Sequence, residues 1–141
     1  KFTKNILEEK QIDVFNHGKH TRDFTYIDDI IEGIIKTLNN PSKGNKDWDS
    51  NLPDPATSKA PWSVYNIGNN SPIKLLDYID ALEKSLDKKA IINFLPLQPG
   101  DVQDTYANVD VLKKKFGYQP KTSVIDGVNK FVNWYKDYYQ L

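Results

Sequence analysis

Arg22, Asn66 and Asp101 are the side chains of this sequence best suited to hold a charged, hydroxyl-rich ligand. Arg22 is the single arginine among 19 basic residues, and its planar fork suits bidentate contact with carboxylate or phosphate. The amide of Asn66 and the carboxylate of Asp101 can bind hydroxyl groups such as those of a ribose. The ordinary alternatives are a surface ion pair for Arg22 and a solvated turn carboxylate for Asp101.

Each of these residues is predicted to lie at the end of a strand. Arg22 opens the stretch RDFTYIDD, which leads from a strand into a helix, and Asn66 lies in a short apolar strand. The turn from Gln98 to Asp101 follows another strand. Because ligands of α/β proteins bind in the crevice at strand ends, we expect these residues to form one site for a phosphorylated ligand.

The residues needed for chemistry on such a ligand are missing from the sequence. No serine lies in a nucleophile elbow, and no glycine-rich phosphate loop leads from a strand into a helix. No tyrosine is followed four residues later by a lysine, and His17 and His20 belong to a polar turn where we expect them to be solvated. The sequence therefore predicts binding without catalytic residues and without a metal site.

Hydrophobic periodicity predicts an alternation of helices and strands. The strongest pattern is the amphipathic helix from Ile27 to Leu38, whose first turn carries Asp28 and Asp29, where the helix dipole favours carboxylates. Other predicted helices are residues 1–9, a helix begun by Ser71 and Pro72, a short one capped by Asn108 and ended by Gly117, and a last one capped by Ser123 with Asp126. Predicted strands are residues 12–15, 22–26, 64–68 and 90–95, and residues 39–62 are irregular.

The alternation defines the fold class as α/β, yet the strands are few and the helices have wide apolar faces. A parallel strand needs cover on both faces, so we expect a sheet that is completed by residues outside this sequence. The apolar face of helix 27–38 is expected to be exposed in its absence. The chain also has no methionine and begins at Lys1 inside a predicted helix, which we interpret as a piece of a longer protein.

Composition narrows the possible partners. Nineteen basic and nineteen acidic residues cancel, which argues against non-specific binding of nucleic acid or of an anionic membrane. The sequence has no cysteine, which excludes disulfides and thiol nucleophiles and fits a reducing compartment. No apolar run approaches the length of about 20 residues that a transmembrane helix needs.

Three motifs carry a resemblance to a known family. The stretches RDFTYIDD (22–29), VYNIGN (64–69) and QPGDV (98–102), in this order, resemble the C-terminal portion of an extended short-chain dehydrogenase/reductase. The stretches 55–73 and 127–139 are similar to bacterial UDP-glucuronate 4-epimerases in particular. The resemblance implies the C-terminal part of a Rossmann-type fold, with a substrate-binding domain and the last elements of the sheet.

The resemblance also implies a role for each site residue. Arg22 falls on the arginine that contacts the nucleotide diphosphate, Asn66 on an asparagine of the substrate region, and Asp101 on the aspartate that contacts the uridine ribose. Gln98 stands where many relatives have a second diphosphate-binding arginine, and it has no charge.

For the whole protein, the resemblance implies an NAD-dependent epimerase that interconverts UDP-glucuronate and UDP-galacturonate. Residues 1–141 would be its UDP-sugar-binding portion, whereas the NAD-binding domain and the catalytic tyrosine-lysine pair would lie upstream. A homodimer in the cytoplasm, serving polysaccharide biosynthesis, is also implied. The alternatives are a related nucleotide-sugar dehydratase or decarboxylase, and a stand-alone nucleotide-sugar-binding module.

Overall fold

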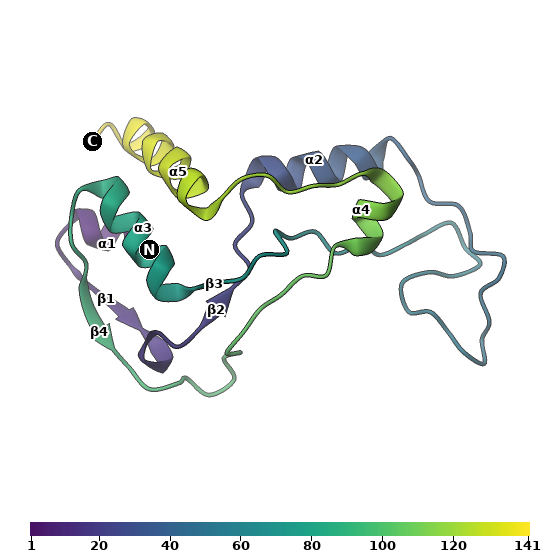
Figure 1. Ribbon diagram of the computed structural model, residues 1–141, viewed down its shortest axis with the longest axis horizontal. Coiled ribbons are helices and arrows are strands. Elements are labelled where there is room, and N and C mark those ends of the chain that lie inside the picture. The colour runs from purple at the N-terminus through teal and green to yellow at the C-terminus, as the bar shows by residue number, and fades with distance from the viewer.

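The computed structural model describes residues 1–141 and shows the predicted mixture of helices and strands (Figure 1). In chain order the elements are α1 (Phe2–Leu7), β1 (Gln11–Val14), the short 3-10 helix η1 (Phe15–Gly18), β2 (Thr21–Arg22), α2 (Ile27–Leu38), β3 (Ile73–Lys74), α3 (Leu75–Leu86), β4 (Ile91–Phe94), α4 (Asp110–Phe116) and α5 (Val124–Tyr139). No helix is long and apolar enough to cross a membrane.

The larger core lies between the parallel strands β1 and β4 and the helices α1, α3 and α5 (Figure 1). The two strands pair in register, with Ile12 opposite Ile92. Apolar side chains from the three helices and β1 meet in a single cluster, against which Ile92 of β4 packs, and which consists of Ile6, Ile12, Val14, Ile79, Ala81, Leu82, Leu86, Val128 and Val132. Burial of this cluster positions β1, from which the chain continues through η1 to Arg22.

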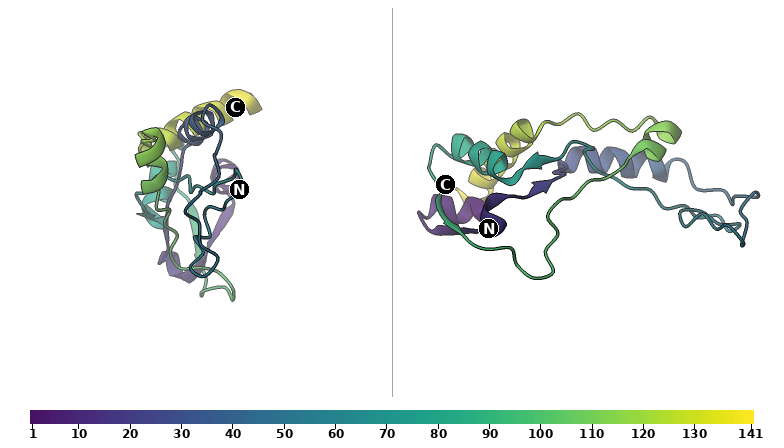
Figure 2. Two further views of the ribbon diagram at one scale, coloured as in Figure 1. Left: turned by 90° about the vertical axis from the view of Figure 1, so that its right-hand side faces the viewer. Right: turned by 60° about the horizontal axis from the view of Figure 1, so that its bottom comes forward.

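A smaller core lies at the other end of the molecule, where α4 packs near α2. It consists of Val109, Leu112 and Tyr118, with Tyr65 and Ile67 packed against it. Figures 1 and 2 show that only extended segments and the short strands β2 and β3 join the two ends. The antiparallel pair of Arg22 with Ile73 therefore lies midway between the two cores.

Helix α2 spans the predicted residues, and its apolar face is largely uncovered, as expected from the sequence. The side chains concerned are between 45% and 75% exposed and comprise Ile27, Ile31, Ile34, Ile35 and Leu38. Only the flank that includes Gly33 packs inward, against Ile67 and Tyr118. The residues of this chain thus do not provide the cover that so wide an apolar stripe requires.

The predicted helix ends are mostly confirmed. Ser123 Oγ accepts a hydrogen bond from the backbone N–H of Asp126 at 3.1 Å and so caps α5. Gly117 ends α4 in the left-handed region, with a φ of 65°. Helix α4 begins at Asp110, after Val109, although the Asn108 side chain still accepts the Asp110 N–H at 2.9 Å.

Two strand predictions and one helix start were wrong. Residues 23–26 and 64–68 contain no strand, because no neighbouring strand offers them a ladder of hydrogen bonds. The N–H of Asp23 instead bonds the Thr105 hydroxyl at 3.1 Å. Ser71 does not cap α3: its N–H bonds Asp23 at 3.1 Å, and two residues of β3 precede the helix. The long stretch between α2 and β3 is irregular, as predicted for residues 39–62.

Asp29 does more than complement the dipole of α2. Its side chain is buried, with 5% exposure, and its two oxygens accept the backbone N–H groups of Lys121 and Thr122 at 3.1 Å each. The neighbouring Asp28 is solvent-exposed and lies 3.7 Å from Lys130. Asp29 therefore attaches the segment that precedes α5 to the first turn of α2.

We expect Asp29→Asn to lower the free energy of unfolding by about 1.5–3 kcal/mol, the value of hydrogen bonds to a charged group. The asparagine amide nitrogen would face a backbone N–H that needs an acceptor. Urea denaturation measures the change, with Asp28→Asn as the matched control, expected to change stability by less than about 0.5 kcal/mol. Equal effects of the two substitutions would contradict the role given to Asp29.

Candidate functional site

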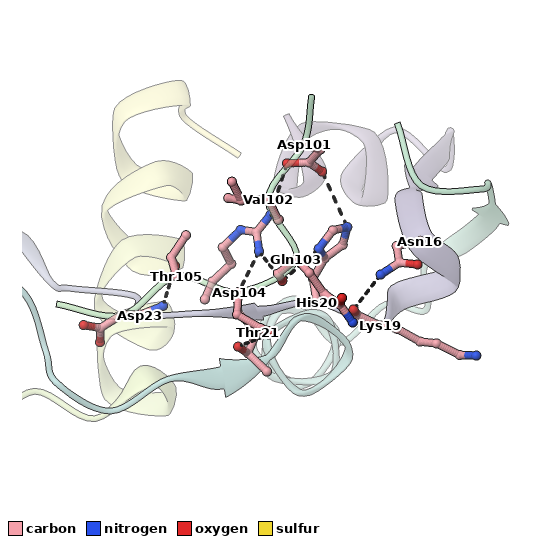
Figure 3. A network of polar contacts seen from close by, with 11 residues as sticks. Asn16, Lys19, His20, Thr21, Asp23, Asp101, Val102, Gln103, Asp104 and Thr105 are labelled. Atoms are coloured by element: carbon pink, nitrogen blue, oxygen red, sulfur yellow. Dashed lines mark hydrogen bonds and ion pairs between the residues drawn. The ribbon is translucent and has the colours of Figure 1, made fainter. Parts of the chain in front are cut away.

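The site forms where the segment 101–105 runs beside β2. Thr21 and Asp104 make an isolated parallel bridge, and the Thr21 hydroxyl donates to the Asp104 carboxylate at 2.6 Å. The backbone of Thr21 also bonds Gln103 and Thr105, each at 3.2 Å. This pairing brings Asp101, at the end of the turn that begins at Gln98, close to β2, and Figure 3 shows Asp101 beside this strand.

Arg22 holds this segment through both terminal nitrogens of its guanidinium. Nη1 donates to the carbonyls of Thr21 and Gln103 at 2.8 Å each. Nη2 donates to the Val102 carbonyl at 2.8 Å and to Asp101 Oδ1 at 3.3 Å. The ion pair that sequence reasoning offered as the ordinary alternative is therefore present, but it is one of several contacts and the longest among them.

His20 is a component of the site that the sequence did not identify. The side chain was expected to be solvated, yet His20 is only 3% exposed. Its Nδ1 lies 3.0 Å from the Gln103 carbonyl, and its Nε2 lies 3.5 Å from Asp101 Oδ2 (Figure 3). The only advance signal was its position two residues before Arg22, which puts both side chains on the same side of an extended chain.

Asp23 is the second residue that sequence reasoning missed. Its carboxylate accepts the backbone N–H groups of Asn70 and Ala107 at 3.0 Å and that of Ser71 at 3.1 Å. These donors come from two segments far apart in the sequence, and Asp23 joins both to the end of β2. A carboxylate next to an arginine was a weak signal of this function, because such pairs are common at surfaces.

Gly68 is required by the close packing around Asp23. A Cβ at this position would lie 2.3 Å from the Ala107 Cβ and 3.0 Å from Asp23 Oδ2, so no larger residue fits. The Gly68 carbonyl accepts the Tyr118 hydroxyl at 3.0 Å. Burial, reinforced by Asp29, Glu32 and Asp23, raises the pKa of this Tyr118 hydroxyl, which therefore stays protonated as a donor.

The structure brings together some of the predicted site residues. Arg22 and Asp101 are in contact, and Gln98 belongs to the same turn, since its carbonyl accepts the Asp101 N–H at 3.1 Å. The Gln98 side chain is exposed and makes no hydrogen bond. Asn66 is exposed and donates to the Asn108 carbonyl at 3.2 Å, near α4, with no contact to Arg22 or Asp101.

An apolar hollow of about 260 Å³ lies beyond Asp23, between the start of α2 and helices α3 and α5. Its walls include Phe24, Tyr26 and Phe131. Phe24 stacks on Tyr78 with ring centroids 4.2 Å apart, and burial raises the pKa of Tyr78. With no charged side chain in its lining, this hollow does not suit a diphosphate.

Comparison with known proteins identifies a family that this chain resembles. The family model described as GDP-mannose 4,6 dehydratase matches residues 1–131. Protein CapI of Staphylococcus aureus is 52% identical over 99% of this chain and 42% of its own length. A probable UDP-glucuronate 4-epimerase of Rhizobium meliloti is 38% identical over 99% of this chain and 41% of its own length.

Solved structures of nucleotide-sugar epimerases and dehydratases also match this chain. The UDP-glucuronic acid 4-epimerase of Bacillus cereus, in complex with UDP-glucuronic acid and NAD, matches with a TM-score of 0.77 and 33% identity. The match covers 98% of this chain and 39% of that one. A dTDP-glucose 4,6-dehydratase of Bacillus anthracis, in complex with NAD, shares the fold with a TM-score of 0.75 at 21% identity, over 99% of this chain and 38% of that one.

The fold is thus that of the Rossmann-type epimerases and dehydratases of nucleotide sugars. The chain belongs to the GDP-mannose 4,6-dehydratase family, within the extended short-chain dehydrogenases/reductases. It spans about 42% of the length of the curated relatives that it matches at 52% identity.

We expect Asp23→Ala to destabilise the protein by about 2–4 kcal/mol, because backbone N–H groups from two segments lose a charged acceptor together. Chemical denaturation measures this change. Asp104→Ala is the matched control: it removes a neighbouring, exposed carboxylate that accepts from one side-chain hydroxyl, and it should cost less than about 1 kcal/mol. A loss for Asp23→Ala no larger than that of the control would contradict the central role of Asp23.

Proposed function

We propose that this chain is the UDP-sugar-binding portion of an NAD-dependent UDP-glucuronate 4-epimerase. The observation that carries the proposal is the contact of Arg22 with the 101–103 segment, which puts a guanidinium beside the Asp101 carboxylate. A cation for phosphate and an acceptor for hydroxyl groups are the two functions that a nucleoside diphosphate requires. The named relatives include UDP-glucuronate 4-epimerases, and a UDP-glucuronic acid complex shares the fold at 33% identity.

In this proposal Arg22 binds the diphosphate by exchanging partners. The four N–H groups of the two terminal nitrogens each have an acceptor, so a bidentate phosphate contact replaces at least one of these acceptors. Asp101 Oδ1, at 3.3 Å, is the most distant acceptor and the one most readily replaced. Asp101 then accepts from the ribose, while Gln98 offers an uncharged donor and Asn66 contacts the substrate region.

We propose no NAD site among these residues. The parallel strands β1 and β4 lead into the 3-10 helix η1 and into the turn at 96–101, and neither enters a helix through a glycine-rich turn. We therefore propose that NAD and the catalytic residues are held by a part of the protein outside residues 1–141. We further propose that the whole protein is a cytoplasmic homodimer that serves polysaccharide biosynthesis.

A nucleotide-sugar dehydratase or decarboxylase is the second candidate. The description of the matching family model favours it, because that model is named for a 4,6-dehydratase. The same Arg22 and Asp101 contacts would serve either reaction, since both begin from a bound nucleotide sugar.

An activity assay separates the two functions. The full-length protein, supplied with NAD and UDP-glucuronate, is expected to form UDP-galacturonate without loss of mass, as followed by chromatography and mass spectrometry. Products that have lost water or carbon dioxide would favour the second candidate. Residues 1–141 alone are the negative control, and turnover by them would overturn the proposed division of the protein.

We expect Arg22→Ala in the full-length protein to weaken UDP-glucuronate binding by about 1.5–3 kcal/mol, the range for a hydrogen bond to a charged group. Arg22→Lys should recover only part of this loss, because an ammonium has no planar fork. Lys114→Ala, on the exposed face of α4, is the control for a lost positive charge. Titration calorimetry gives the affinities, and unaltered binding by Arg22→Ala would contradict the proposed role.

A further inference from the structure

His20 presents a buried nitrogen atom that has no hydrogen-bond partner. A backbone carbonyl can only accept, so the 3.0 Å contact with Gln103 requires that Nδ1 carries a proton. The other nitrogen, Nε2, is shielded from solvent and makes no hydrogen bond. It lies 3.5 Å from Asp101 Oδ2, which is the only acidic oxygen placed within ion-pair distance of the ring.

The charge state of His20 decides whether its contact with Asp101 is repulsive or a hydrogen bond. In the neutral ring, with Nδ1 protonated, Nε2 is a bare acceptor facing a carboxylate oxygen, which is unfavourable. In the imidazolium, Nε2–H becomes a donor aimed at Asp101. The contact therefore changes from repulsive to attractive when Nε2 gains a proton.

Few other charged groups face the ring. Arg22 on β2 reaches the opposite oxygen of Asp101 at 3.3 Å and is the competing cation. Asp104, on the same segment as Asp101, is bonded to the Thr21 hydroxyl at 2.6 Å. Lys19 precedes His20 and points away from Asp101 (Figure 3), while Lys74 on β3 pairs opposite Thr21 and is exposed.

We propose that His20 is a positioning residue that takes up a proton when a nucleoside diphosphate draws Arg22 away from Asp101. The imidazolium then replaces the guanidinium as the cationic partner of Asp101 and keeps this carboxylate aimed at the ribose hydroxyls. The proton comes from solvent and is bound at Nε2, and no covalent bond changes otherwise. The inference rests on the proposed function, because it requires that Arg22 and Asp101 bind the nucleotide.

The sign of the pH dependence follows from this exchange. Removing Arg22 from Asp101 leaves an unbalanced carboxylate beside Nε2, and the arriving diphosphate adds further negative charge nearby. Both changes favour the imidazolium, so the bound state holds more protons than the free state. Ligand binding is therefore tighter at lower pH. It is accompanied by a net uptake of protons from the buffer.

The test is calorimetry of UDP-glucuronate binding to the full-length protein, without added NAD so that turnover contributes no heat. This ligand suits the test because a diphosphate esterified at both ends has no proton that titrates near neutrality. The expected result at pH 7 is net proton uptake, detected by comparing buffers of different ionisation enthalpy. The dissociation constant should be about three- to tenfold lower at pH 6 than at pH 8.

Two substitutions separate positioning from a structural role. His20→Asn places an amide nitrogen near Nδ1, so it keeps the bond to Gln103 and loses the contact with Asp101. His20→Gln places its amide nitrogen near Nε2, as a donor to Asp101 that never titrates. Both should abolish the proton uptake, and the glutamine variant should bind more tightly than the asparagine variant at pH 8. Thermal unfolding of both variants checks that the fold is kept.

The outcomes are distinct. Proton uptake that persists in both variants would overturn the role of His20. Wild-type binding that is weakened by Arg22→Ala but shows no proton uptake would overturn this inference and leave the proposed function standing. Absence of any UDP-glucuronate binding by the wild-type protein would overturn both.

Discussion

The rest of the structure depends on the Asp23 carboxylate. The molecule has two small cores at opposite ends, and the site lies between them, where little apolar surface is buried. Asp23 accepts backbone N–H groups from Asn70, Ser71 and Ala107 and so ties two irregular segments to the end of β2. Asp29, in the first turn of α2, likewise accepts the backbone N–H groups of Lys121 and Thr122. Charge-assisted hydrogen bonds here take the place of a hydrophobic core.

Arg22, the proposed contact for the diphosphate, also has a structural role. Its guanidinium holds the 101–103 segment through the carbonyls of Val102 and Gln103, so the proposed binding of a diphosphate exchanges the Asp101 contact and can leave these two bonds in place. The exchange affects Asp101 most, because this carboxylate lies between Arg22 and His20. A shared carboxylate is what couples the proposed phosphate contact to the protonation of a buried ring.

The apolar face of α2 is the feature of the fold that bears most directly on the proposed division of the protein. Five exposed isoleucine and leucine side chains on one helix face form an apolar patch that is typical of an interaction surface. Residues 1–141 supply cover for one flank alone, through Ile67 and Tyr118. This agrees with the division proposed above, in which the chain contributes the substrate side of a nucleotide-sugar enzyme and another part of the protein contributes the cofactor side.

The sequence by itself determined the features that depend on neighbours within a few residues: the span of α2, the Ser123 cap of α5 and the end of α4 at Gly117. It also predicted that Arg22 and the turn at Asp101 lie at one site, but it wrongly placed Asn66 beside them. Only the tertiary structure decided that residues 23–26 and 64–68 are not strands, that His20 is buried and that Asp23 joins distant segments. The physical reason is that a strand, a buried ring and an accepting carboxylate are defined by partners about 50 to 80 residues away, as the bonds of Asp23 to Asn70 and of His20 to Gln103 show.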